Sequence, residues 1–154
     1  WAEARSLGEL GMLAVGYVVK NRAEDTEHHR LFGHGIKGVV LKNKQFSCWN
    51  AGDPNRDAMK EMYETSQIIQ TKTPPKGYDS YEDWYNEFKN STRYREYQTW
   101  LDAFRIARTI LNGTAKDPTH GATYYHTTGV KPIWRNELDR VGRIADHIFY
   151  KLPE

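Results

Sequence analysis

The segment Leu10–Val19, LGMLAVGYVV, is apolar at almost every position and runs directly into Lys20-Asn21-Arg22. We predict a helix from about Gly8 to Arg22, with Leu10 on one apolar face and Met12 on the opposite one. A helix that is apolar all round is usually buried among other elements. The rest of the chain is therefore expected to pack around this helix.

Length and composition set the first limits. The chain has 154 residues, 38% of them apolar, and these values fit one domain with a modest core and a polar surface. No segment approaches the roughly 20 apolar residues that span a bilayer. No secretory signal pattern is visible either, and the sequence begins inside what resembles a folded element, so we expect the N-terminus to be truncated.

The cysteine content and the net charge say little about the fold or the partner of the protein. Cys48 is the single cysteine, so the fold does not depend on an internal disulfide. The net charge of +2 is compatible with an anionic partner such as cell wall or nucleic acid, but it is too small to choose between them.

Helix start signals divide the middle of the chain. Asp53 as N-cap with Pro54 at the first helical position predicts a second helix to about residue 70. Ser80, with Asp83 three residues later, resembles a capping box and predicts a short helix to about residue 90. A longer helix is predicted over residues 93–112, with an apolar stripe that includes Leu101, Phe104 and Leu111.

The remaining segments are shorter. Residues 23–35 are polar and interrupted by glycines, so they predict a loop, and residues 36–41 are an apolar run that fits either helix or strand. The β-branched and aromatic segment 121–128 predicts a strand, and 148–150 a short closing strand. The fold class is therefore α+β, mostly α, in a single domain over residues 1–154.

Nucleophile and metal chemistry have weak support. Cys48 with His120 or His126 would make a thiol–imidazole pair, as in a peptidase, but a lone cysteine beside aromatic residues is more often a small buried hydrophobe. The histidines of the segment 28–34, HHRLFGH, lie in a polar loop without the spacing of a zinc helix. We predict no metal and no cofactor.

The segment 78–100 carries eight aromatic residues among basic ones. Such a pattern can stack nucleic-acid bases or sugar rings, or it can pack internally. Several acidic residues in the same segment weaken its positive field, which argues against a nucleic-acid partner. A non-catalytic module that binds glycan or nucleic acid stays open as an alternative.

Glu3 lies two positions from the start of the sequence, just before the apolar helix. Glycoside cleavage needs an acid that protonates the leaving oxygen. Burial among aromatic side chains would suit Glu3 for this role, because burial favours the protonated carboxyl group. By itself, an acid so close to a terminus is more often solvated.

Several short motifs make Glu3 more informative. Glu3-Ala4-Arg5 is followed by Gly11, Ala14-Val15 and Asn21-Arg22 at a characteristic spacing. Further motifs follow in order: Val39-Val40, Gln45-Phe46-Ser47, Gly121-Ala122, Tyr125-His126, Pro132, Trp134 and His147-Ile148-Phe149-Tyr150. This arrangement resembles the SleB-type cell wall hydrolases, a family of spore-cortex-lytic and phage lytic enzymes. Residues 55–112 match only loosely, and residues 73–100 look like an aromatic-rich insertion.

The resemblance implies a lysozyme-like fold and cleavage of the bond between N-acetylmuramic acid (MurNAc) and N-acetylglucosamine (GlcNAc) in peptidoglycan. It implies lytic transglycosylase chemistry, with a muramidase as the alternative, and places Glu3 at the position of the catalytic acid and base. Leu7 stands where the family has a second glutamate. The candidate substrate-binding residues are Gln45, Ser47, Tyr124, Tyr125, His126 and Trp134.

A protein of this kind acts on glycan strands at the cell wall or in the periplasm. With no signal in the sequence, we expect delivery by phage lysis, by a virion, or by a signal outside this segment. The resemblance needs no cofactor, no nucleic acid and no membrane span.

Overall fold

The computed structural model describes all 154 residues as a mostly helical α+β fold with a small sheet near the C-terminus. This is the predicted fold class. The elements are α1 (Gly8–Glu24), α2 (His29–Phe32), α3 (Gly35–Val40), η1 (Ser47–Trp49), α4 (Pro54–Thr71), α5 (Tyr81–Lys89), α6 (Thr92–Leu111), β1 (Tyr124–Thr127), η2 (Ile133–Asn136), β2 (Asp139–Ile144) and β3 (His147–Lys151).

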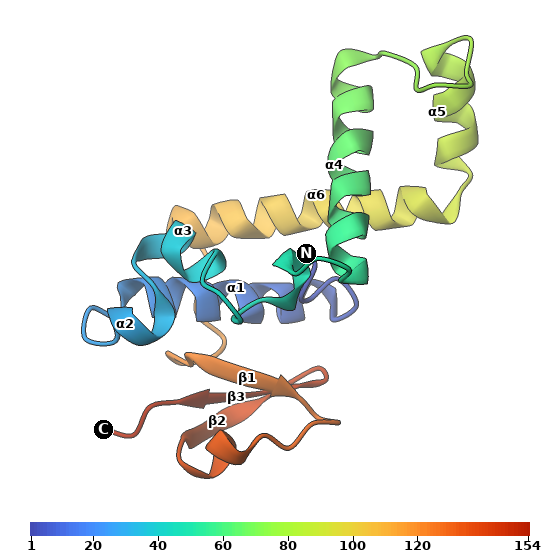
Figure 1. The fold of residues 1–154 in the computed structure, drawn as a ribbon. Coiled ribbons are helices and arrows are strands. Elements are labelled where there is room, and N and C mark those ends of the chain that lie inside the picture. Colours follow the sequence, from blue (N-terminus) through green and yellow to red (C-terminus); the bar gives the residue numbers. More distant parts are fainter.

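Helix α1 lies between two layers, with α6 and α3 above it and the sheet below it (Figure 1). Ala14 and Val18 are fully buried against Phe149 of the sheet, while Met12 packs toward α6. The central position predicted for this helix is confirmed. The prediction for Leu10 is wrong, because this side chain is 56% exposed in a surface groove between α1 and α6.

The sheet has three antiparallel strands in the order β1-β3-β2. Strands β1 and β3 confirm the two predicted segments, with Tyr125 opposite Phe149. Strand β2 was not predicted, because its sequence DRVGRI combines three charged residues with a glycine and lacks an apolar run. A register shift between Arg140 and Gly142 further breaks its alternation.

The helix start signals are confirmed at both predicted caps. The Asp53 carboxylate accepts a hydrogen bond from the Asn55 backbone N–H at 2.8 Å, and Pro54 begins α4. The Ser80 hydroxyl oxygen accepts one from the Asp83 N–H at 3.1 Å and opens α5. Each cap satisfies a backbone donor that the helix itself leaves free.

Helices α4 and α5, with the first half of α6, project from the rest of the molecule as an arm (Figure 1). All eight aromatic residues of segment 78–100 belong to one cluster in this arm or pack against it. The apolar stripe predicted for α6, which also included Tyr94 and Tyr97, is wrong in part. Tyr97 is buried in the arm cluster, but Leu101, Phe104 and Leu111 face solvent, and Ile106 and Ile110 are buried instead. The reason is that α6 changes partner along its length, from the arm cluster to α1.

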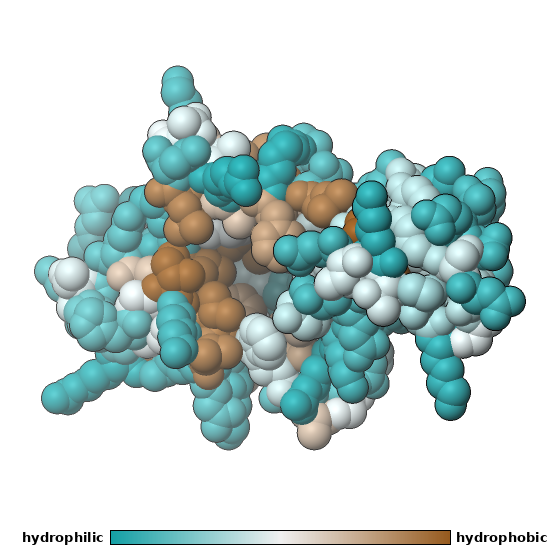
Figure 2. All heavy atoms as spheres, turned by 90° about the horizontal axis from the view of Figure 1, so that it is seen from above, coloured by the Kyte–Doolittle hydropathy of each residue, from teal (hydrophilic) through white to brown (hydrophobic).

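The face seen from above is hollowed near its centre, and hydrophobic side chains border the hollow (Figure 2). The floor is α1, and α3 and α6 form the walls. None of the helices is both long enough and apolar enough to be a membrane span.

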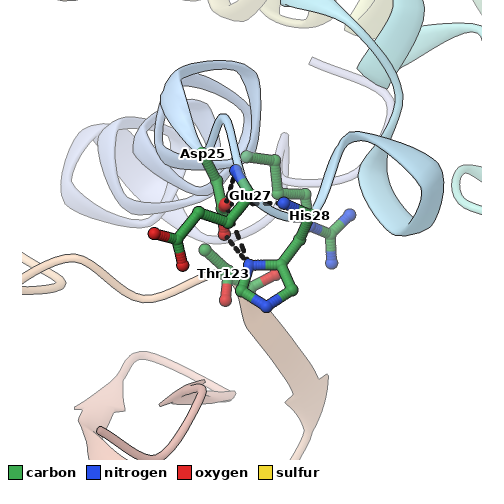
Figure 3. Close-up of polar contacts among 5 residues, drawn as sticks. Asp25, Glu27, His28 and Thr123 are labelled. Atoms are coloured by element: carbon green, nitrogen blue, oxygen red, sulfur yellow. Dashed lines mark hydrogen bonds and ion pairs between the residues drawn. The ribbon is translucent and has the colours of Figure 1, made fainter.

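The segment predicted as a loop over residues 23–35 contains the short helix α2, so that prediction is wrong in part. The Asp25 side chain folds the chain back after α1, because it accepts hydrogen bonds from the backbone N–H groups of Glu27 and His28 at 3.1 and 3.0 Å (Figure 3). It also bonds the His28 ring at 2.9 Å. This turn lets Phe32 reach the core, where it is almost fully buried.

Candidate active site

The hollow between α1, α3 and α6 is a cleft of about 220 Å³. The N-terminal turn, the segment around Cys48 and the start of α4 close one end of it. Glu3 is the only charged side chain among the lining residues, and most of the others are aliphatic or aromatic. A single carboxylate in an apolar cleft is a candidate for acid–base chemistry.

Glu3 is held in a tight turn rather than on a loose end. The backbone N–H groups of Ala4 and Arg5 both donate to the carbonyl of Trp1, at 3.1 and 2.8 Å. Ala4 is buried in the core against α1. Arg5 turns away from Glu3, since its guanidinium stacks on the Trp1 ring and donates to Asn55 of α4 at 2.7 Å. The half-buried Glu3 carboxyl group therefore has a defined position.

Tyr125 of β1 supplies a hydrogen-bond donor to this carboxyl group. Its hydroxyl donates to Glu3 Oε2 at 3.3 Å. Burial raises the pKa of Tyr125 well above its usual value, and the Glu3 charge adds to this while Arg22 opposes it. The phenol therefore stays neutral and keeps its proton. The His147 ring lies 5.0 Å from the Tyr125 ring and burial lowers its pKa, so it packs there as a neutral group.

Cys48 lies beside Glu3 in the same cleft. Burial, the Glu3 charge and a side-chain hydrogen bond to Glu3 raise the pKa of the thiol to about 11. No hydrogen bond joins Cys48 to His120 or His126, because the His126 ring nitrogens bond the Thr127 carbonyl and the Tyr150 hydroxyl. A neutral thiol without a base is a poor nucleophile, so this geometry disfavours the peptidase alternative.

Gln45 and Ser47 differ in their surroundings, and both lie outside the cleft lining. The Gln45 amide is already used inside the protein: its oxygen accepts from Arg22 at 2.9 Å and its nitrogen donates to the Leu31 carbonyl at 2.9 Å. Ser47 is exposed at the start of η1. Neither residue lines the cleft.

Tyr124, His126 and Trp134 gather on the sheet, away from the cleft lining. The Trp134 ring lies 5.4 Å from Tyr124 and 5.6 Å from His126. Tyr150 completes this aromatic group, with its ring 5.3 Å from His126. Of the candidate residues on β1, the structure brings only Tyr125 to Glu3.

Asn21 and Arg22 join α1 to the β region. The Asn21 amide donates to Asp117 and to the Ala122 carbonyl, both at 3.0 Å. Arg22 Nε donates to the Thr123 carbonyl at 2.6 Å. These contacts hold β1, and with it Tyr125, at a fixed place beside α1.

Arg22 is buried without a carboxylate partner. Its guanidinium lies over the rings of Phe32, Phe46 and Tyr124, at 5.4, 5.9 and 5.7 Å from their centroids. The ring faces and two neutral oxygens take the place of a counter-ion. Sequence reasoning missed Asp117, for which the only signal was the Asp-Pro-Thr turn that precedes the strand.

The structure contains no group of three or more histidine, cysteine or acidic side chains that could hold a metal ion. His29 and His34 stack on each other at 4.6 Å, and His28 is bonded to Asp25.

Comparison with protein-family models identifies the family to which the chain belongs. Residues 7–150 match the model of the family described as Cell Wall Hydrolase. The chain belongs to the cell wall hydrolase family. The match begins four residues after Glu3 and includes both α1 and the strands of the sheet that α1 contacts. No curated protein sequence matches the chain.

Two solved structures show the same fold as this cell wall hydrolase. One is the catalytic domain of the germination-specific lytic transglycosylase SleB from Bacillus anthracis, with a TM-score of 0.57 and 21% identity over 98% of this chain and 86% of that one. The other is the catalytic domain of the Bacillus cereus SleB protein, with the same TM-score and identity over 98% of this chain and 82% of that one. The lysozyme-like fold class is thereby confirmed.

Proposed function

We propose that this cell wall hydrolase cleaves the glycosidic bond between MurNAc and GlcNAc in peptidoglycan, with Glu3 as the acid and then the base. The observation that carries the proposal is the Glu3 carboxyl group, held in a turn at the cleft and bonded by Tyr125 at 3.3 Å. Family membership and the likeness to a lytic transglycosylase domain support the substrate class.

The single carboxylate favours lytic transglycosylase chemistry over hydrolysis. Most glycosidases that use water need two carboxyl groups across the scissile bond. Glu3 is the only one that lines this cleft. Asp53, whose charge reaches Cys48, is engaged as the cap of α4.

The proposed reaction uses one group twice. The Glu3 carboxyl group gives its proton to the glycosidic oxygen, the C1–O bond breaks, and positive charge develops at C1 of MurNAc. The Glu3 carboxylate then takes the proton of the MurNAc C6 hydroxyl as that oxygen bonds to C1 and closes a 1,6-anhydro ring.

The other candidate residues have supporting roles in this proposal. The aromatic group of Tyr124, His126 and Trp134 stabilises the sheet that carries Tyr125, and Trp134 offers a partly exposed ring to a sugar beyond the cleft. Gln45 fixes Arg22, and Ser47 offers an exposed hydroxyl group at the rim. The protein acts at the cell wall, as a single catalytic domain with segment 73–100 as an insertion.

The test is Glu3→Gln on purified peptidoglycan. We expect the loss of turbidity to slow by about 10²- to 10⁴-fold, the usual effect of removing a general acid. Glu9→Gln is the matched control, because Glu9 is an exposed acid of the first turn of α1 that pairs with Arg105. A Glu3→Gln protein that is folded by circular dichroism and cleaves like the wild type would sink the assignment.

Mass spectrometry of the released fragments identifies the reaction. Anhydro-MurNAc ends are expected for a transglycosylase. Reducing MurNAc ends, formed by water, would identify a muramidase and would require a second group to activate that water.

A further inference from the structure

A second hollow, of about 320 Å³, lies on the arm in the angle between α4 and α6. We call it the arm groove. Its lining includes four aromatic and two amide side chains: Tyr63, Tyr97, Trp100, Phe104, Gln67 and Gln70. None of its lining residues is charged.

Two of the four aromatic rings of the arm groove are unusually open to solvent. Tyr63 of α4 is 58% exposed and Phe104 of α6 is 60% exposed, although both have large apolar surfaces. The Trp100 ring supports Phe104 edge-on at 5.3 Å. Such exposure on two neighbouring helices marks a binding surface more often than a packing defect.

Two amides complete this surface. Gln67 and Gln70 lie three residues apart on α4, so they share one side of the helix. Both are exposed, and neither side-chain amide bonds another group of the protein. A sugar ring presents an apolar C–H face and a polar rim, which match ring faces and free amides respectively. None of the lining side chains carries the positive charge on which nucleic-acid binding depends, so the groove favours sugar rings over a polyphosphate.

The arm groove lies beside the Glu3 cleft, although the two hollows share no lining residue. Met59 lines the cleft, and Tyr63 follows it by one turn of α4, a rise of about 6 Å. On α6, Ala103 lines the cleft and its neighbour Phe104 lines the groove. The Trp1 ring of the cleft meets Trp100 at 5.4 Å.

We propose that the arm groove binds a further stretch of the glycan strand whose bond is cleaved at Glu3. The strand stacks sugar rings on Tyr63 and Phe104, and its hydroxyl or N-acetyl groups bond Gln67 and Gln70. This inference depends on the proposed function for the identity of the strand. It assigns to the arm a role in holding the substrate rather than in the chemistry.

The test measures binding without cleavage, in the Glu3→Gln background. The probe is peptidoglycan glycan strands freed of their stem peptides by an amidase, which leaves a carboxylate on each MurNAc lactyl group, and neutral chitin oligosaccharides serve as a second probe. Isothermal titration calorimetry at about 0.15 M salt measures the binding of both. Tyr63→Ser combined with Phe104→Ser should weaken binding about tenfold, a loss of about 1.4 kcal/mol. Leu111→Ser is the matched control, since Leu111 is equally exposed on α6 but lies outside the groove. Gln67→Leu with Gln70→Leu tests the amides separately, and circular dichroism confirms folding.

Three outcomes would overturn the proposal. The first is unchanged binding in both double variants. The second is binding only to strands that keep their peptides, which would assign the groove to the stem peptide. The third is a change from dimer to monomer in sedimentation velocity with unchanged glycan binding, which would make it a self-association surface. Wild-type cleavage by Glu3→Gln alone, with binding still lost in the groove variants, would instead remove the catalytic assignment and leave the groove in place.

Discussion

The Tyr125 hydroxyl and the Glu3 carboxylate, 122 residues apart in sequence, meet at 3.3 Å at the cleft. This contact connects the N-terminal turn to the first strand of the sheet. It means that the position of the proposed acid depends on where β1 lies, and β1 in turn is held by the end of α1.

Tyr125→Phe removes the donor and keeps the ring. We expect peptidoglycan cleavage to fall by about fivefold to tenfold, which corresponds to one hydrogen bond of about 1 kcal/mol. Initial rates from pH 4 to pH 9 are the measurement. Tyr81→Phe is the control, because its hydroxyl makes no hydrogen bond within the protein and it lies on the arm, outside the cleft lining. Equal rates and profiles for both variants would show that the contact does not serve catalysis.

Cys48→Ser keeps a donor beside Glu3 and should leave cleavage close to the wild-type rate, because the buried neutral thiol is not the nucleophile. With a pKa of about 11, roughly one thiol in a thousand is ionised at pH 8, so iodoacetamide should react slowly with the folded protein and fast after unfolding in urea. Rapid alkylation of the folded protein together with loss of activity would instead support the alternative that Cys48 is the nucleophile of a peptidase.

Arg22→Lys keeps the charge but loses the planar group that bonds Thr123 and Gln45 and lies over three rings. The expected cost is about 2 kcal/mol in the free energy of unfolding, measured by urea denaturation. Arg30→Lys, on an exposed side chain of α2, should change little. A cost no greater than that of the control would show that the buried guanidinium is replaceable.

Asp117 makes the stability depend on acid. Burial acts to raise its pKa, but the hydrogen bonds from Thr119, Asn21 and Gly121 outweigh burial and hold the pKa below its usual value. A depressed pKa in the folded state stabilises the protein above the unfolded value of about 3.9, and this stabilisation is lost as the pH falls through the folded value. The difference in urea midpoint between wild type and Asp117→Asn should therefore be large at pH 7 and small at pH 2.

The same experiment has an internal control. Asp79 is an exposed residue before α5. The difference in urea midpoint between wild type and Asp79→Asn should therefore be about the same at pH 7 and at pH 2. A constant gap between wild type and Asp117→Asn at all pH values would mean that the carboxylate charge is not what stabilises this turn.

The arm and the cleft share helix α6, so we expect one cooperative unfolding transition for residues 1–154. Far-ultraviolet circular dichroism follows all helices. In a variant with Trp49→Phe and Trp134→Phe, tryptophan fluorescence follows Trp1, Trp84 and Trp100, which belong to the arm cluster or pack against it. The two thermal curves should coincide. Separate midpoints would show that the arm unfolds as an independent unit.

Much of the helical fold could be predicted from local sequence. Asp53-Pro54 and Ser80 begin their helices as predicted, because cap chemistry acts within three residues. Strand β2 and the exposed side of α6 could not be predicted in this way. Their burial depends on partners distant in sequence, such as β3 for β2 and α1 for Ile106 and Ile110.

The same limit applies to the candidate site: some of its residues could be predicted from the sequence, but their contacts could not. Glu3 could be proposed from motif order, and Tyr125 from the strand motif, but only the fold shows that they touch. Gln45 is a polar residue whose amide is satisfied by Arg22, and no spacing rule reveals that a buried cation lies beside it. The arm groove was equally hidden, since Tyr63 and Phe104 lie on separate helices and outside the aromatic segment 78–100.

The two connections between α1 and the β region differ in what can break them. Arg22 is held by a carbonyl, an amide and ring faces, none of which titrates in acid. Asn21 is held in part by Asp117, which does. Acid unfolding should therefore have a direction: the turn at residues 117–121 opens first, while β1 and Tyr125 stay docked on the end of α1.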